Sequence, residues 1–361
     1  MKRLVEEGME AGAWGLSTGL EYAPGLFTPT DEIVELARTA ARRGGIYATH
    51  MRNEEAGLAS AVDEALDVGR RSGARVEISH LKAAGRPNWP LLESAIERIE
   101  RARDDGVDVM ADAYPYTAYA TGLTILLPSW ARDGGRDAML GRLADAAVRE
   151  RILAELPERI AGDPGGPELI RISAVETHVN RRFIGRTLRD VADELETDPA
   201  SALVLLLRLE NGGVSYIGFA MSDANVERVL SHPLVTIGSD GVSVAPEGPD
   251  AAWKPHPRSY GTCPRVLGLY ARERRIFDLP TAIAKMTSRP ADHFGLTDRG
   301  RIAPGKKADL VIFDSGTIAD RATFEEPHRY PTGVRHVLVN GEAVVREGRH
   351  TGARPGRMLR K

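Results

Sequence analysis

The residues best suited to catalysis are two histidines and an aspartate, each at the end of a stretch typical of a buried strand. His50 ends the run 46–50 (IYATH), His80 ends the run 76–80 (VEISH), and Asp240 ends the run 234–240 (LVTIGSD). Neutral imidazole and carboxylate groups are ligands that suit a divalent metal such as zinc. If the fold brings these strand ends together, the three side chains form a candidate metal site.

Strands and helices alternate regularly in the first half of the chain. Apolar runs at 46–50, 76–80 and 107–112 are separated by amphipathic stretches at about 57–71 and 91–102, and His50 and His80 are 30 residues apart. This rhythm indicates a parallel sheet, as either a doubly wound sheet or a (β/α) barrel. In a barrel, active sites lie at the carboxyl ends of the strands, which is where both histidines and Asp240 would meet.

The rhythm changes twice further along the chain. Residues 127–230 combine helical stretches with loops rich in Gly and Pro, which is typical of a lid-like insertion. After residue 300, apolar runs at 308–313, 336–339 and 343–345 surround the hairpin signal Asn340-Gly341. We therefore predict a partial barrel at 1–300, with an insertion at about 127–230, and a β module at 301–361.

Composition excludes several classes of protein. The 361 residues are 42% hydrophobic with a formal net charge of −3, and basic residues form no stripe, so we expect no nucleic-acid or anionic-membrane partner. The sequence contains no apolar run long enough to predict a membrane span. Acidic residues near Met1 come before any apolar stretch, so the first residues do not have the pattern of a signal peptide. The single cysteine excludes an internal disulfide and fits a reducing compartment, so a cytoplasmic location is expected. Zincin, P-loop, Rossmann and α/β-hydrolase motifs are absent from the sequence.

Several short motifs resemble those of the N-acyl-D-amino-acid deacylases (D-aminoacylases) of the amidohydrolase superfamily. They occur in order over essentially the whole chain, at residues 15–20 (GLSTGL), 47–54 (YATHMRNE), 78–82 (ISHLK), 112–116 (DAYPY), 237–241 (IGSDG), 256–261 (HPRSYG) and 300–310 (GRIAPGKKADL). The resemblance implies a metal-bearing (β/α)8 barrel, TIM-like, with a small β-sandwich formed from both chain ends. This α/β chain would hold barrel strands four to eight and the C-terminal segment of the sandwich.

The resemblance also implies roles for individual residues. His50 and His80 correspond to ligands of zinc, and Asp240 corresponds to the catalytic acid and base. The substrate carboxylate would be bound by residues of three further motifs, namely Lys82, Tyr114 and Arg258. The implied reaction is hydrolysis of the amide bond of a small N-acyl-D-amino acid, by metal-activated water, to a carboxylate and a free D-amino acid.

Two departures from the family pattern affect this expectation. The family begins with a sandwich segment, a strand carrying His-x-His and a strand carrying a metal-binding cysteine, whereas His50 is the first histidine here. The resemblance therefore predicts an N-terminally truncated chain with weak metal affinity, unstable or inactive when isolated. Ala120 stands where the family often has a serine that helps to hold the substrate.

Two other functions remain open at this point. A cyclic-amide hydrolase of the same superfamily, such as a hydantoinase or a dihydroorotase, usually has a carboxylated lysine on barrel strand four. The matching stretch, residues 14–20, contains no lysine, which argues against this alternative. A non-catalytic remnant, left after loss of the metal site, is the other alternative.

Overall fold

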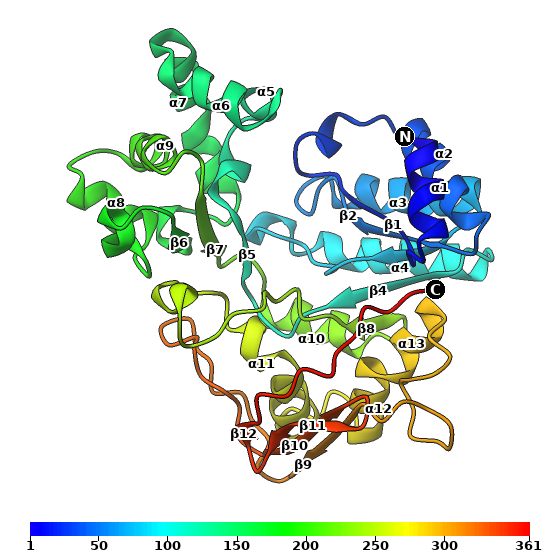
Figure 1. Cartoon of the computed structure of the whole chain (residues 1–361). Helices are drawn as coiled ribbons and strands as arrows, with labels where there is room; N and C mark the ends of the chain where they lie inside the picture. Colours follow the sequence, from blue (N-terminus) through cyan, green and yellow to red (C-terminus); the bar gives the residue numbers. More distant parts are fainter.

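A five-stranded parallel sheet forms the central layer of the computed structural model, which describes residues 1–361 apart from the side chains of residues 249 and 250. Its order β1-β2-β3-β4-β8 follows the chain (Figure 1). The strands are β1 (Gly15–Gly19), β2 (Ile46–His50), β3 (Arg75–Ile78), β4 (Val109–Ala113) and β8 (Val235–Ile237). Parallel neighbours in sequence order are the arrangement of a (β/α) barrel, so the predicted fold class is confirmed.

Helices connect these strands and cover the sheet. They include α1 (Lys2–Glu10), α2 (Thr30–Ala41), α3 (Leu58–Ser72), α4 (Leu91–Asp104) and α10 (Asp223–Ser231). Apolar residues of the strands and helices share one core, in which Val62 of α3, Ile78 of β3 and Val109 of β4 are fully buried. Gly73, at φ +74°, ends α3 in the left-handed conformation that glycine adopts without strain.

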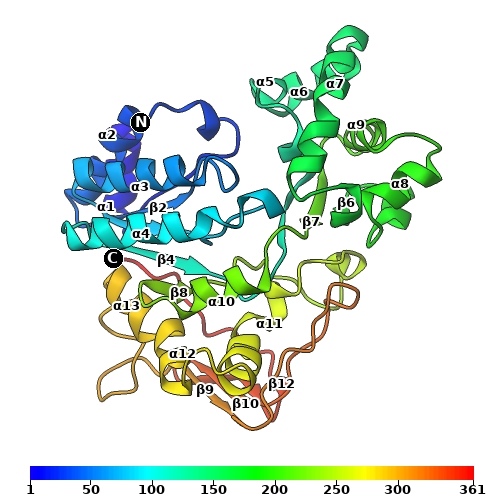
Figure 2. The same ribbon diagram turned by 180° about the vertical axis from the view of Figure 1, so that it is seen from behind.

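A second, antiparallel sheet stands apart from the parallel one in both ribbon views (Figures 1 and 2). Its order is β5-β7-β6, from β5 (Tyr119–Gly122), β6 (Ile170–Val175) and β7 (Val214–Gly218). It carries α5 (Ser129–Arg132), α6 (Gly135–Ala144), α7 (Ala146–Gly162), α8 (Leu188–Glu194) and α9 (Pro199–Leu209). The helical character of residues 127–230 was predicted from the sequence, but the sheet was not, because each of its strands is short and pairs with strands distant in the sequence.

The C-terminal part begins with α11 (Arg258–Arg265), a π-helical segment (Val266–Glu273), α12 (Leu279–Met286) and α13 (Ser288–Phe294). A four-stranded antiparallel sheet follows, in the order β12-β11-β10-β9, from β9 (Leu310–Phe313), β10 (Val334–Val339), β11 (Glu342–Arg346) and β12 (Arg349–His350). Asn340 and Gly341 have φ of +50° and +85°, as a tight hairpin turn between β10 and β11 requires. Among the described residues, no helix is both long and apolar enough to cross a membrane.

Candidate metal centre

His50 and His80 lie side by side at the carboxyl edge of the parallel sheet. His50 is the last residue of β2, and His80 follows β3 by two residues. Because β2 and β3 are parallel neighbours, both strands end at the same edge, and the Ser79 N–H donates to the Thr49 carbonyl to hold them in register. The His50 Nδ1 and His80 Nε2 atoms are 2.9 Å apart.

The second nitrogen of each imidazole faces a carboxylate. His50 Nε2 lies 2.8 Å from Glu21 Oε2, and His80 Nδ1 lies 2.9 Å from Glu54 Oε1. Histidines that bind metals usually donate their other N–H to a carboxylate or a carbonyl, which fixes the ring and its tautomer. If Glu21 and Glu54 accept the N–H protons of the rings, the lone pairs of His50 Nδ1 and His80 Nε2 point toward one another. Lys82 Nζ also lies 2.9 Å from His80 Nδ1 and competes with Glu54 for this nitrogen.

This arrangement fits a divalent cation. Two nitrogen lone pairs 2.9 Å apart repel one another unless a proton or a cation lies between them. Two nitrogens bound tetrahedrally to one zinc ion are about 3.3 Å apart, from zinc–nitrogen distances of about 2.0–2.1 Å. The two imidazoles are therefore placed as a pair of metal ligands would be.

Like Glu21, Glu54 is a residue of this centre that was not predicted from the sequence. Its carboxylate and the two imidazoles each offer one ligand atom within 4.8 Å of the others, so it is also a candidate third ligand. However, Glu54 Oε1 contacts His80 Nδ1, and Lys82 Nζ lies 2.6 Å from the same carboxylate. These contacts favour an orienting role. The signal in the sequence is a carboxylate four residues after His50, in the loop that follows the same strand.

Lys82 and Glu54 form a buried ion pair beside the histidines, with side chains 9% and 8% exposed. Burial alone would raise the pKa of Glu54, but the neighbouring Lys82 and His80 outweigh it and hold this pKa below its usual range. Burial would lower the pKa of Lys82, but Glu54 outweighs it and raises that pKa. Lys82 Nζ also donates to the His80 carbonyl at 2.9 Å, so both charges have their partners within the protein.

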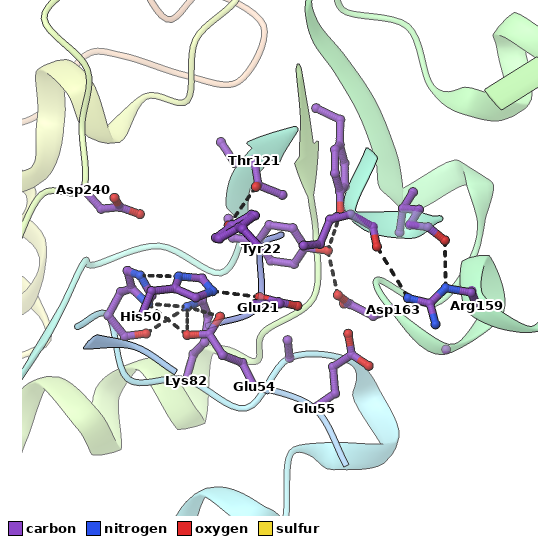
Figure 3. Close-up of a pocket in the computed structure, with 18 of the residues that line it drawn as sticks. Glu21, Tyr22, His50, Glu54, Glu55, Lys82, Thr121, Arg159, Asp163 and Asp240 are labelled. Carbon is purple, nitrogen blue, oxygen red and sulfur yellow. Dashed lines mark hydrogen bonds and ion pairs between the residues drawn. The ribbon is translucent and has the colours of Figure 1, made fainter. Parts of the chain in front are cut away.

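Asp240 lies on another side of the same cavity, two positions beyond the glycine that follows β8 (Figure 3). Its Oδ2 is 2.8 Å from Arg258 Nη2, and Arg258 is the first residue of α11. The Arg258 guanidinium lies over the Tyr114 ring, 4.7 Å from its centroid. Within the described part of the chain, the buried Tyr114 hydroxyl and Arg258 Nη1 have no hydrogen-bond partner.

A cavity of about 720 Å³ joins these groups. It lies between the carboxyl edge of the parallel sheet and the segment that carries β5 and β7. The predicted site residues that line it are His50, His80, Lys82, Tyr114 and Asp240. Arg258 reaches it through its contacts with Asp240 and Tyr114. The fold thus brings together all six residues named from the sequence, while their individual roles stay predictions.

Five parallel strands in barrel order, with two carboxylate-oriented histidines at their carboxyl edge, place a candidate metal site where (β/α) barrels have their active sites. Residues 1–345 match the model of the amidohydrolase family, and the chain belongs to this family.

Three relatives from Alcaligenes xylosoxydans xylosoxydans are similar over 99–100% of the chain: an N-acyl-D-glutamate deacylase (38% identical), a D-aminoacylase (37%) and an N-acyl-D-aspartate deacylase (37%). The chain spans 62–64% of the length of these relatives. The resemblance seen in the motifs is therefore confirmed.

Solved structures show the same relationship. An N-acyl-D-glutamate deacylase from Bordetella bronchiseptica, complexed with zinc and a phosphonate inhibitor, is 36% identical with a TM-score of 0.82, and a D-aminoacylase is 34% identical with a TM-score of 0.81. Each match covers the whole chain and 65% of the solved one. An L-hydantoinase from Arthrobacter aurescens covers 97% of this chain and 68% of its own, at 15% identity and a TM-score of 0.52. This last likeness shows a shared fold alone, so it does not favour the cyclic-amide alternative.

Proposed function

We propose that this protein hydrolyses the amide bond of N-acyl-D-amino acids and releases a carboxylate and a free D-amino acid. The observation that carries the proposal is the His50–His80 pair, in which each ring is oriented by a carboxylate so that one nitrogen of each faces a common point. The chain is similar over 99–100% of its length to three deacylases of N-acyl-D-amino acids, and this similarity supports the proposed substrate class.

His50 and His80 would hold the metal, and zinc is proposed because imidazole nitrogens suit it and a relative's structure contains it. When bound, such an ion polarises the acyl carbonyl and lowers the pKa of a water molecule. Glu21 and Glu54 keep the two rings in the tautomers that leave His50 Nδ1 and His80 Nε2 without protons.

Asp240 is proposed to carry the proton. Arg258 occupies its Oδ2, so Oδ1 is the oxygen that would accept a proton from the attacking water and return it to the leaving amine. General acid–base assistance of this kind contributes roughly 10²–10⁴-fold in rate. Arg258 would also keep the carboxylate turned toward the cavity.

The substrate carboxylate is proposed to bind to Arg258 and Tyr114. Arg258 Nη1 and the Tyr114 hydroxyl are buried donors without a partner among the described residues, and buried donors are costly unless a ligand satisfies them. Lys82 would add positive charge nearby, although Glu54 already neutralises much of it. These contacts would place the scissile amide between the histidines and Asp240.

Metal binding and turnover test the proposal separately. Purified chain freed of metal is titrated with zinc by calorimetry, and deacylation of N-acetyl-D-methionine is followed by release of the amino acid. His50→Ala and His80→Ala should each abolish zinc binding, whereas Asp240→Asn should keep it and lower turnover by roughly 10²–10⁴-fold. His178→Ala, in an exposed loop of the α7–α8 region, is the matched control and should change neither quantity. Zinc binding unchanged in both histidine variants would overturn the proposal. Absence of zinc binding would also overturn it, and would agree instead with the weak metal affinity that the family resemblance predicts for this chain.

A further inference from the structure

The cavity has a second arm, on the side away from Asp240 (Figure 3). Glu55, from the loop after β2, and Asp163, directly after α7, bring their carboxyl groups together there. Tyr119, Tyr216 and Arg159 also line the cavity, and the hydroxyls of Tyr119 and Tyr216 lie beside Asp163. Because none of these residues belongs to the metal centre or to the proposed carboxylate site, the arm is free to contact another part of a substrate.

Negative charge predominates in the whole cavity. Its lining contains seven carboxylates, namely Glu21, Glu54, Glu55, Glu155, Glu158, Asp163 and Asp240, but only two cationic side chains from lysine or arginine, namely Lys82 and Arg159. The Lys82 charge is taken up by Glu54. Arg159 donates from Nε to the Leu126 carbonyl at 2.8 Å and from Nη2 to the Ile125 carbonyl at 3.4 Å.

Glu55 and Asp163 have no lysine or arginine nitrogen within 4.0 Å among the residues whose side chains the structure describes. Burial and the charge of Glu21 raise the pKa of Glu55, although Arg159 acts in the opposite direction. Burial and the neighbouring Glu55 raise the pKa of Asp163 to about 8. At neutral pH Asp163 is therefore largely protonated, and the pair carries about one negative charge, which repels a further anion. Above the pKa of Asp163, its own charge adds to this repulsion.

Asp163 also offers an unused acceptor. The Tyr119 hydroxyl donates to Asp163 Oδ2 at 2.7 Å, and the Tyr119 and Tyr216 hydroxyls are 2.8 Å apart. Asp163 Oδ1 is buried and receives no hydrogen bond from the described part of the protein. A buried acceptor without a donor is costly, so a ligand group that donates a hydrogen bond would be favoured here.

We infer that this arm selects substrates by charge: it accepts an N-acyl-D-amino acid whose side chain ends in a cation or a hydrogen-bond donor, and it rejects one with a second carboxylate. The inference rests on the proposed deacylase function and names its substrate class. The percentage identity to relatives does not decide the preferred side-chain charge of the substrate. Relatives named for N-acyl-D-glutamate and N-acyl-D-aspartate are 38% and 37% identical to this chain. The Glu55–Asp163 pair selects by charge, because a second substrate carboxylate would face two carboxyl groups that have no ion pair, among the described side chains, with a lysine or arginine within 4.0 Å, Arg159 being directed to two main-chain carbonyls.

Binding to the zinc-loaded full chain tests the inference independently of turnover. Calorimetry compares N-acetyl-D-lysine, N-acetyl-D-methionine and N-acetyl-D-glutamate, and we expect the lysine derivative to bind roughly tenfold or more tightly than the glutamate derivative. At pH 9, above the pKa of Asp163, Asp163→Asn and Glu55→Gln should each reduce this ratio several-fold, because each then removes a negative charge while keeping the shape. Glu158→Gln, which removes an exposed carboxylate at the edge of the same cavity, is the matched control and should leave the ratio within about twofold.

Three binding results would overturn the inference: tighter binding of the glutamate derivative to the wild type, a ratio unchanged in both variants, or no binding of any of the three compounds. The wild-type comparison needs neither variant, and melting temperatures show whether each variant is folded. The expected binding order without deacylation would refute the proposed function but support this selectivity. Deacylation of all three derivatives with equal kcat/KM would support the function and refute the selectivity.

Discussion

The buried pair of Glu54 and Lys82 leads to a quantitative prediction. Glu54→Gln keeps the shape of the side chain but removes the charge opposite Lys82, whose Nζ lies 2.6 Å away. With both side chains less than 10% exposed, water cannot replace the lost partner. Removing one member of a buried pair costs about 3–5 kcal/mol, because the other charge is left without compensation. Lys82 would keep its contact with the His80 carbonyl, so we expect about 3 kcal/mol.

Urea unfolding at pH 7 measures this loss as a lower free energy of unfolding. The double variant Glu54→Gln with Lys82→Met should recover most of the stability, because it leaves no buried charge. The matched control is Glu93→Gln, which breaks the exposed pair with Arg228 and should cost less than about 1 kcal/mol. A loss below 1 kcal/mol for Glu54→Gln, or a double variant as unstable as the single one, would refute the reasoning.

The pH dependence of this difference has a definite sign. The pKa of Glu54 is lower in the folded protein than its ordinary value of 4.5, so its contribution is present above pH 4.5 and is lost as the pH falls toward the folded value. The pKa of Lys82 is raised above its ordinary value of 10.5, so its contribution is present below pH 10.5 and is lost as the pH rises through the folded value. The stability gap between wild type and Glu54→Gln should therefore be widest between about pH 5 and pH 10.

Three further predictions concern stability, and urea unfolding tests each. Burial lowers the pKa of Lys285 to about 7, so wild-type stability should gain up to about 1.4 kcal/mol per pH unit between pH 7 and 10, and Lys285→Met should remove this rise. Glu210→Gln should cost about 2–3 kcal/mol, since this fully buried carboxylate accepts two main-chain N–H groups at 2.7 Å and two side-chain donors; a cost near zero would contradict that account. Gly341→Ala should cost about 1 kcal/mol, because its φ is +85°, whereas Gly356→Ala, in open space, should be neutral.

Much of the parallel sheet was predictable because its elements follow local rules. A strand buried on both faces is a short apolar run, and a covering helix repeats its apolar residues every three to four positions. The positions of His50 and His80 followed from the same rules, since parallel neighbours end at one edge. The motifs around these residues also predicted the amidohydrolase family, which the match over residues 1–345 confirms.

The antiparallel sheet β5-β7-β6 was not predictable in this way. Its pairings join residues that are far apart in the chain, such as Ala120 and Arg171, which both pair with Ile217, and no local pattern encodes that choice. The path of the chain through α5 to α9 decides which strands meet, and burial of the apolar faces of these helices decides that path.

By itself, the sequence determined which strands end in catalytic residue types, because strand periodicity and parallel pairing act over a few residues and between adjacent units. Only the tertiary structure decided which carboxylates lie beside these catalytic residue types and orient them. Glu21 and Glu54 turn each imidazole toward the other, and Glu55 meets Asp163 across the cavity, through loops whose course depends on everything packed beneath them. The types of side chain at the strand ends can therefore be predicted from the sequence. The orientation of these side chains and the charges around them depend on tertiary packing.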